Sequence, residues 1–175
     1  DKLALIVTML ATIAWLFQPH HEVTASVLIV SGLLLVVRLS RWCPLATVRE
    51  PIVAILHLGY GWLALSLVLM GTAIVWPAAV APGAALHALT AGAVGTMTLA
   101  VMTRASLGHT GREIVADGWT LAIYLCVTVG ALIRVGAGLV PAFYLPLLAA
   151  GGLIWSLAFV LFVIRYGPIL MRPRL

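Results

Sequence analysis

The sequence predicts an all-α protein, a polytopic transmembrane helical bundle. Of its 175 residues, 63% are apolar, and only ten Lys or Arg and five Asp or Glu are present. These polar side chains are too few to cover a soluble domain of this length. Long stretches without any charged residue recur along the chain, and each can cross a hydrocarbon core of ~30 Å as a helix. Apolar runs such as 153–164 also lack the alternation of a transmembrane β-strand.

Three breaks divide the first half of the chain into three predicted spans. Each break contains a proline, at Pro19, Pro44 and Pro77, and proline cannot continue a helix. Two further breaks divide the second half: a segment rich in glycine and basic residues from Arg104 to Arg112, and Pro141. We expect six helices in one transmembrane domain over residues 1–175, at 2–17, 23–39, 51–76, 83–103, 117–140 and 142–165.

The distribution of basic residues predicts the orientation. If Lys2 is cytoplasmic, every other Lys or Arg except Arg134 falls in a loop or tail on the same side. Because basic loops stay inside, both termini are expected in the cytoplasm. These residues are spread over short loops and do not gather on one face, so nucleic acid is not an expected partner, whereas the lipid bilayer is.

Three ionisable residues remain inside the predicted spans, namely His57, His87 and Arg134. An ionisable group in a span is costly unless it faces protein, water or a cofactor. At 100° per residue His57 shares a face with small residues of its helix, and His87 shares one with Thr90 and Thr98. Small-residue faces are where membrane helices pack closely, so neither histidine is expected to face lipid.

Two interpretations of these histidines stay open. Each imidazole either bonds to a neighbouring helix or binds a metal or haem iron. His57 lies ~9 Å from the cytoplasmic end of its span and His87 ~6 Å from the outer end of the next, so one shared metal ion is not expected. Arg134, about level with His87, either reaches the outer interface or pairs with Glu22 or a haem propionate.

Two polar loops give weaker signals. His20 and His21 are adjacent, as in some copper or zinc sites, but an exposed polar turn is the favoured explanation. The predicted inner loop, from Arg104 through His109 to Arg112, has glycines and basic residues that can hold an anion. It lacks the Lys-Ser/Thr ending of a phosphate-binding loop, and no hydrolase constellation is present in the spans.

Two motifs resemble the NnrS family of bacterial membrane proteins. The first is Arg49-Glu50-Pro51-Ile52 running into Leu56-His57-Leu58-Gly59-Tyr60-Gly61-Trp62. The second runs from His87-Ala88-Leu89-Thr90-Ala91-Gly92-Ala93-Val94-Gly95 to Ser106-Leu107-Gly108-His109-Thr110-Gly111-Arg112. Both are similar to motifs of the family's C-terminal half. Outside residues 49–113 the resemblance extends only to hydropathy.

The resemblance implies a multi-pass protein of the bacterial inner membrane that carries haem b and copper and acts in nitric oxide response or nitrosative-stress resistance. Carried over by position, it favours His57, His87, Arg104, His109 and Arg112 as cofactor-binding residues. Family members have about twelve spans. We therefore expect this chain, which begins with Asp1, to form a homodimer or to lack an N-terminal half.

Two other functions remain as alternatives. A cofactor-free transporter or channel half would use glycine-interrupted helices such as 92–95 to form a site near the membrane midplane. A haem-bearing electron-transfer anchor would have both axial positions of its iron filled. Whether the chain has enzymatic activity is left open by its sequence.

Overall fold

The computed structural model describes residues 2–174, and all of the regular structure there is helical. The long helices are α1 (Lys2–Phe17), α2 (Glu22–Ser40), α3 (Pro51–Val75), α6 (Gly118–Gly136) and α7 (Tyr144–Leu170). Between α3 and α6, one continuous rod consists of α4 (Pro82–His87), the π-helix η2 (Ala88–Val94) and α5 (Gly95–His109). Three short 3₁₀ turns complete the chain, η1 (Pro44–Thr47), η3 (Ala137–Leu139) and η4 (Pro141–Phe143).

The helices confirm an all-α membrane protein. Five segments are long and apolar enough to cross a bilayer: Glu22–Ser40, Pro51–Val75, Pro82–His109, Gly118–Leu139 and Pro141–Leu170. The first helix, α1, is apolar but has only 16 residues. Five of the six predicted spans are therefore supported by length and composition.

Two predicted helix ends were placed too early. The fourth segment continues past residue 103 to His109, so Arg104 and His109 are helical and do not lie in a loop. Charged residues near a helix C-terminus do not end it, because they interact favourably with the helix dipole. The helix ends at its C-cap Thr110. The next residue, Gly111, has a φ of 76°, in the left-handed region that commonly follows a helix. The last helix likewise continues past Arg165 to Leu170 and contains Pro168.

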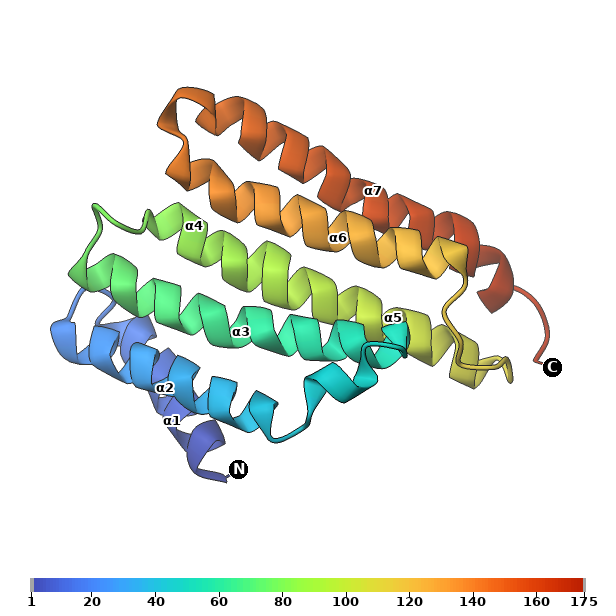
Figure 1. Cartoon of the computed structure of the whole chain (residues 1–175), viewed down its shortest axis with the longest axis horizontal. Helices are drawn as coiled ribbons and strands as arrows, with labels where there is room; N and C mark the ends of the chain where they lie inside the picture. Colours follow the sequence, from blue (N-terminus) through green and yellow to red (C-terminus); the bar gives the residue numbers. More distant parts are fainter. Residues whose placement is uncertain (1, 175) are drawn as a thin grey trace.

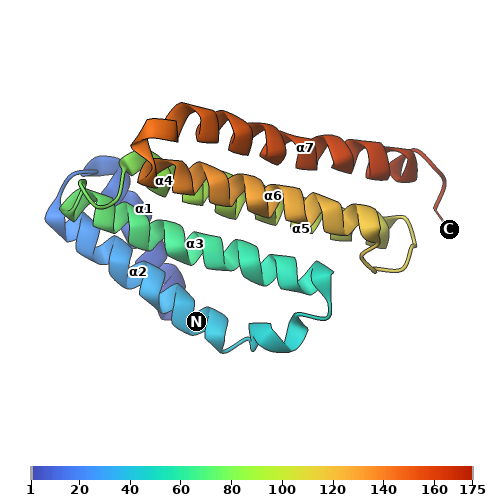
Figure 2. The ribbon, with the colours of Figure 1, turned by 45° about the horizontal axis from the view of Figure 1, so that its top comes forward.

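The rods lie side by side and alternate in direction (Figures 1 and 2). The α4–η2–α5 rod lies between α3 and α6, with α1 and α2 on the α3 side and α7 on the α6 side. Short turns at 18–21, 76–81 and 137–143 gather at one end of the bundle, called here the short-turn end. The longer connections at 41–50 and 110–117 and the C-terminal tail gather at the other, called here the basic end.

Glycine permits the closest helix contacts. A Cβ added to Gly32 of α2 would lie 2.7 Å from the carbonyl oxygen of Ala64 on α3. A Cβ added to Gly130 of α6 would lie 2.6 Å from the backbone nitrogen of Trp155 on α7. Without a hydrophobic force between helices in lipid, such close backbone approach supplies the packing energy.

A polar network joins the start of α6 to α7 near the basic end. Asp117 caps α6 by accepting hydrogen bonds from the backbone N–H and the hydroxyl of Thr120, at 2.9 and 2.7 Å. Its other oxygen pairs with Arg165 Nε at 2.7 Å. Thr120 also contacts the Tyr166 hydroxyl at 2.7 Å. Burial alone would raise the pKa of Asp117, but the bonds from Thr120 and Arg165 outweigh it and hold that pKa below 3.8.

Candidate functional site

His57 lies on α3, close to the basic end, and its ring is held by η1. Its Nδ1 is 2.9 Å from the Thr47 hydroxyl oxygen. That hydroxyl donates its single proton to the Pro44 carbonyl, at 2.9 Å, so it accepts from the imidazole. The proton of neutral His57 is therefore on Nδ1. The lone pair on Nε2 is then available to a ligand, the arrangement that a metal-binding histidine requires.

Aromatic and cationic side chains surround this imidazole. The Trp42 ring lies 6.2 Å from the His57 ring and 4.8 Å from the Tyr60 ring, measured between centroids. The Arg38 guanidinium lies over Trp42 at 5.1 Å and over Tyr60 at 5.9 Å. The Tyr60 hydroxyl is buried and has no hydrogen-bond partner among the described residues. We call Arg38, Trp42, Thr47, His57 and Tyr60 the His57 cluster.

His87 is the last residue of α4 and adjoins the π-helix η2. The Gly95 N–H, which would bond to Ala91 in an α-helix, bonds instead to the carbonyls of Thr90 and Gly92. The indole Nε1 of Trp155 on α7 donates to the Ala91 carbonyl at 3.1 Å. A π-helix has a wider turn, so residues after His87 are rotated away from the predicted shared face. Thr90 and Thr98 line a groove against α7, and His87 does not.

The structure keeps His57 and His87 apart. His57 is near the basic end of α3 and His87 near the short-turn end of the next rod. The rise of an α-helix places them roughly 20 Å apart along the bundle. Each is half-buried. The expectation of two separate environments at different depths is therefore consistent with the fold.

Residues from both sequence motifs meet at the basic end. Arg49 and Arg104 line one hollow of about 390 Å³ together with Glu50. Arg104 and His109 line an adjacent hollow of about 450 Å³. Arg112 lies beyond the helix end, where its Nη1 donates to the Thr110 carbonyl at 3.4 Å. Arg104 thus connects the two hollows, with Arg49 on one side and His109 on the other.

The predicted outer polar residues occupy different places. His21 caps α2, because its Nδ1 accepts from the Val23 N–H at 3.2 Å. His20 lines a hollow of about 450 Å³ beside Met70. Arg134 points into the groove between η2 and α7 and forms no ion pair with Glu22 or any other described residue. Within residues 2–174, no group of three or more His, Cys, Asp or Glu could hold a metal ion.

Sequence reasoning missed the residues that support these groups. Thr47 precedes α3 and Trp155 lies on the last span, so neither is within one or two turns of the residue it contacts. Asp117 carried a usable signal, because an Asp immediately before an apolar helix and three residues before a Thr is a typical capping pattern. Its pairing with Arg165 depends on the packing of α6 against α7.

The fold and the buried polar groups define the class of the molecule. Five bilayer-length apolar helices are joined by short connections, and ionisable side chains remain at helix–helix contacts inside the spans. This is an integral, multi-pass helical membrane protein.

The family follows from the whole chain. A model of the family described as NnrS protein matches residues 1–174, so this protein belongs to the NnrS family. The match also covers α1, α2, α6 and α7, for which the two motifs alone had predicted a resemblance only in hydropathy. No curated protein and no solved structure matches the chain.

Proposed function

We propose that this protein is a haem-binding member of the NnrS family that acts in the response to nitric oxide, with His57 as an axial ligand of the iron. One observation carries the proposal. The Thr47 hydroxyl accepts from Nδ1 of His57, which leaves the Nε2 lone pair free for iron. Family membership gives the biological context.

The donor set of the His57 cluster fits a haem edge. The partly exposed imidazole is the usual axial ligand of haem b, and the Trp42 and Tyr60 rings offer flat surfaces beside it. The buried Tyr60 hydroxyl, unpartnered among the described residues, is a hydrogen-bond donor without an acceptor. His87, roughly 20 Å away along the bundle by the helical rise, belongs to a different environment.

Haem would supply an iron that binds nitric oxide directly. The chain's own residues would set how that iron behaves. His57 would bind it from one side, Thr47 would fix the orientation and basicity of the imidazole, and the apolar spans would exclude water. Copper is a different case: the described residues provide no group of three or more His, Cys, Asp or Glu, so no step is assigned to copper.

Absorption spectra test the proposal. Detergent-purified protein made with ample haem should show a Soret band that shifts when nitric oxide is added. His57→Ala should lose the band, whereas His21→Asn, which removes an exposed imidazole but keeps a capping side chain, should retain it. A flat spectrum in the wild type, or a band unchanged in His57→Ala, would reject His57 as the ligand.

Thr47 provides a second test of the same site. Thr47→Val keeps the shape but removes the acceptor of Nδ1, and loss of such an outer partner typically lowers affinity for the bound metal group about 10–100-fold. Thr47→Ser should restore it. Equal haem affinity in Thr47→Val and wild type would show that the imidazole does not depend on this bond.

The membrane placement is part of the proposal. Arg41, Arg49, Arg112 and Arg172 all lie at the basic end of the bundle, which supports a cytoplasmic location for that end in a bacterial inner membrane. With α1 as a sixth span, both termini are cytoplasmic. A reporter that is active only in the cytoplasm should be active when it is fused after residue 175. An intact but inactive fusion would show that the orientation is the opposite of the one proposed.

A further inference from the structure

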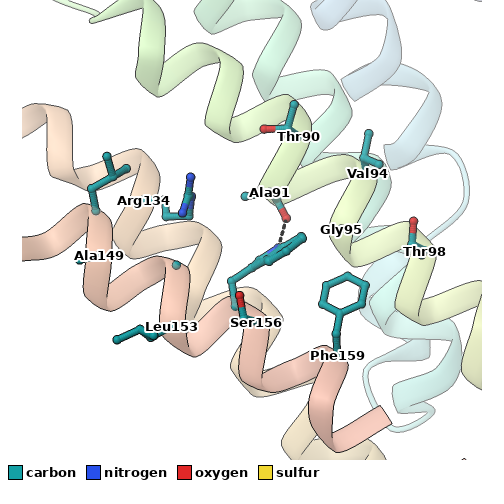
Figure 3. A pocket seen from close by; sticks show the side chains of 13 residues that line it. Thr90, Ala91, Val94, Gly95, Thr98, Arg134, Ala149, Leu153, Ser156 and Phe159 are labelled. Carbon is teal, nitrogen blue, oxygen red and sulfur yellow. Dashed lines mark hydrogen bonds between the residues drawn. The ribbon is translucent and has the colours of Figure 1, made fainter. Parts of the chain in front are cut away.

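A groove lies between the η2–α5 segment and α7, with one residue of α6 at its side (Figure 3). Its volume is about 840 Å³, and its walls are mainly apolar, including Val94, Leu153 and Phe159. Thr90, Thr98 and Ser156 contribute hydroxyl groups. The groove has no histidine, cysteine or methionine in its lining, so it offers no axial ligand for haem.

Arg134 is the only charged residue in this lining. It lies on α6, five residues before Leu139 ends the span, which places it ~7 Å inside the short-turn end. Its side chain packs along α7, where a Cβ added to Gly152 would lie 2.8 Å from Nη1. Figure 3 shows its guanidinium extending into the space between the helices. Among the described residues, its guanidinium has no hydrogen-bond or ion-pair partner.

We propose that this groove binds a phospholipid, with the phosphate on Arg134 and an acyl chain between η2–α5 and α7. A recessed guanidinium at the edge of a bilayer requires an anion, and its planar fork matches the oxygens of a phosphate. The inward half of the groove requires an apolar occupant. A phospholipid near the membrane surface provides both groups in this order.

The dimensions agree with this occupant. Along α7 the lining runs from Leu148, near the start of the helix, to Phe159 near its middle. These eleven helical steps measure ~16 Å, which is close to the length of the apolar part of an acyl chain. The widened π-helix sets one wall of the groove, and the bond from Trp155 to the Ala91 carbonyl fixes that wall against α7.

The site should favour anionic phospholipids. In phosphatidylcholine the lipid's own ammonium competes with Arg134 for the phosphate, whereas phosphatidylglycerol has no such group. The occupant is a whole phospholipid, so inorganic phosphate should not displace it, because free phosphate lacks the chain that fills the apolar half.

Native mass spectrometry with added phosphatidylglycerol or phosphatidylcholine tests the binding. The wild type should retain one phosphatidylglycerol in preference to phosphatidylcholine. Arg134→Gln should weaken phosphatidylglycerol binding about tenfold and remove the preference, since one charge-assisted contact has that value. Ser156→Phe should block the acyl chain. Val160→Phe is the matched control, because Val160 is exposed on the same helix but does not line the groove.

Fluorescence provides a measurement that does not depend on those variants folding. Phosphatidylglycerol with brominated acyl chains should quench Trp155, which lines the groove, and the quenched component should be absent in Trp155→Phe. The proposal is overturned if Arg134→Gln and Ser156→Phe bind phosphatidylglycerol as the wild type does, or if inorganic phosphate displaces the lipid. It is also overturned if brominated lipid quenches the fluorescence of Trp155→Phe as strongly as that of the wild type.

Discussion

Replacing Gly130 by alanine should separate α6 from α7. The added Cβ would lie 2.6 Å from the Trp155 backbone nitrogen and 2.8 Å from its Cα. Backbone atoms cannot rotate away as a flexible side chain can, so the two helices must move apart. Overpacking of this kind costs about 1–3 kcal/mol in the free energy of unfolding. The added methyl also improves helix propensity by about 0.5–1 kcal/mol, which offsets part of that cost.

Gly136 on the same helix is the matched control. It is helical, and a Cβ added there meets no atom within 4 Å. Gly136→Ala should therefore be neutral or slightly stabilising, because only the propensity gain applies. Unfolding of both variants in mixed micelles, followed by circular dichroism, would measure the difference.

The expected result is a lower free energy of unfolding for Gly130→Ala than for Gly136→Ala. Loss of contact between the helices should also shift the fluorescence of Trp155, whose backbone is the obstacle. Equal stability of the two variants would refute the inference that close backbone approach holds α6 against α7.

Two further predictions concern polar contacts. Because the folded pKa of Asp117 is depressed, its ionised form stabilises the protein above pH 3.8, and this contribution is lost as the pH falls through the lower folded value. Thermal midpoints should therefore be higher for wild type than for Asp117→Asn at pH 7 and converge in acid; a constant difference would contradict the shift. Trp155→Phe should lower the free energy of unfolding by about 1 kcal/mol, because it removes the donor to the Ala91 carbonyl. In this variant, amide hydrogen exchange should become faster in η2 and stay unchanged in α2. Unchanged exchange in η2 would exclude a stabilising role for this bond.

Much of the fold could be predicted from the composition and from the proline-containing or polar segments that separate the apolar stretches. The predicted helices at 2–17, 23–39 and 51–76 agree with α1, α2 and α3 within about two residues at each end. The errors at Arg104 and Arg165 have one cause: a charged residue was taken as the end of a helix, whereas arginine near a C-terminus is compatible with helical backbone.

The candidate site was less accessible from the sequence. His57 and His87 could be selected because an ionisable side chain in an apolar span is costly. Their partners could not be selected, since Thr47 reaches His57 through a turn and Trp155 reaches Ala91 from another helix. The π-helix was also missed, because its residues Ala88–Val94 have no composition that separates them from an α-helix.

The sequence by itself determined the helical membrane class, because apolar stretches without charges have few other stable structures in lipid. It also determined that His57, His87 and Arg134 need a special environment. Only the tertiary structure decided what each environment is: a hydroxyl that orients His57, a π-helix after His87, and an apolar groove around Arg134. The reason is that side-chain contacts between helices depend on how each helix is rotated about its axis and on the distance between neighbouring helices. Small residues such as Gly130 set both through close packing.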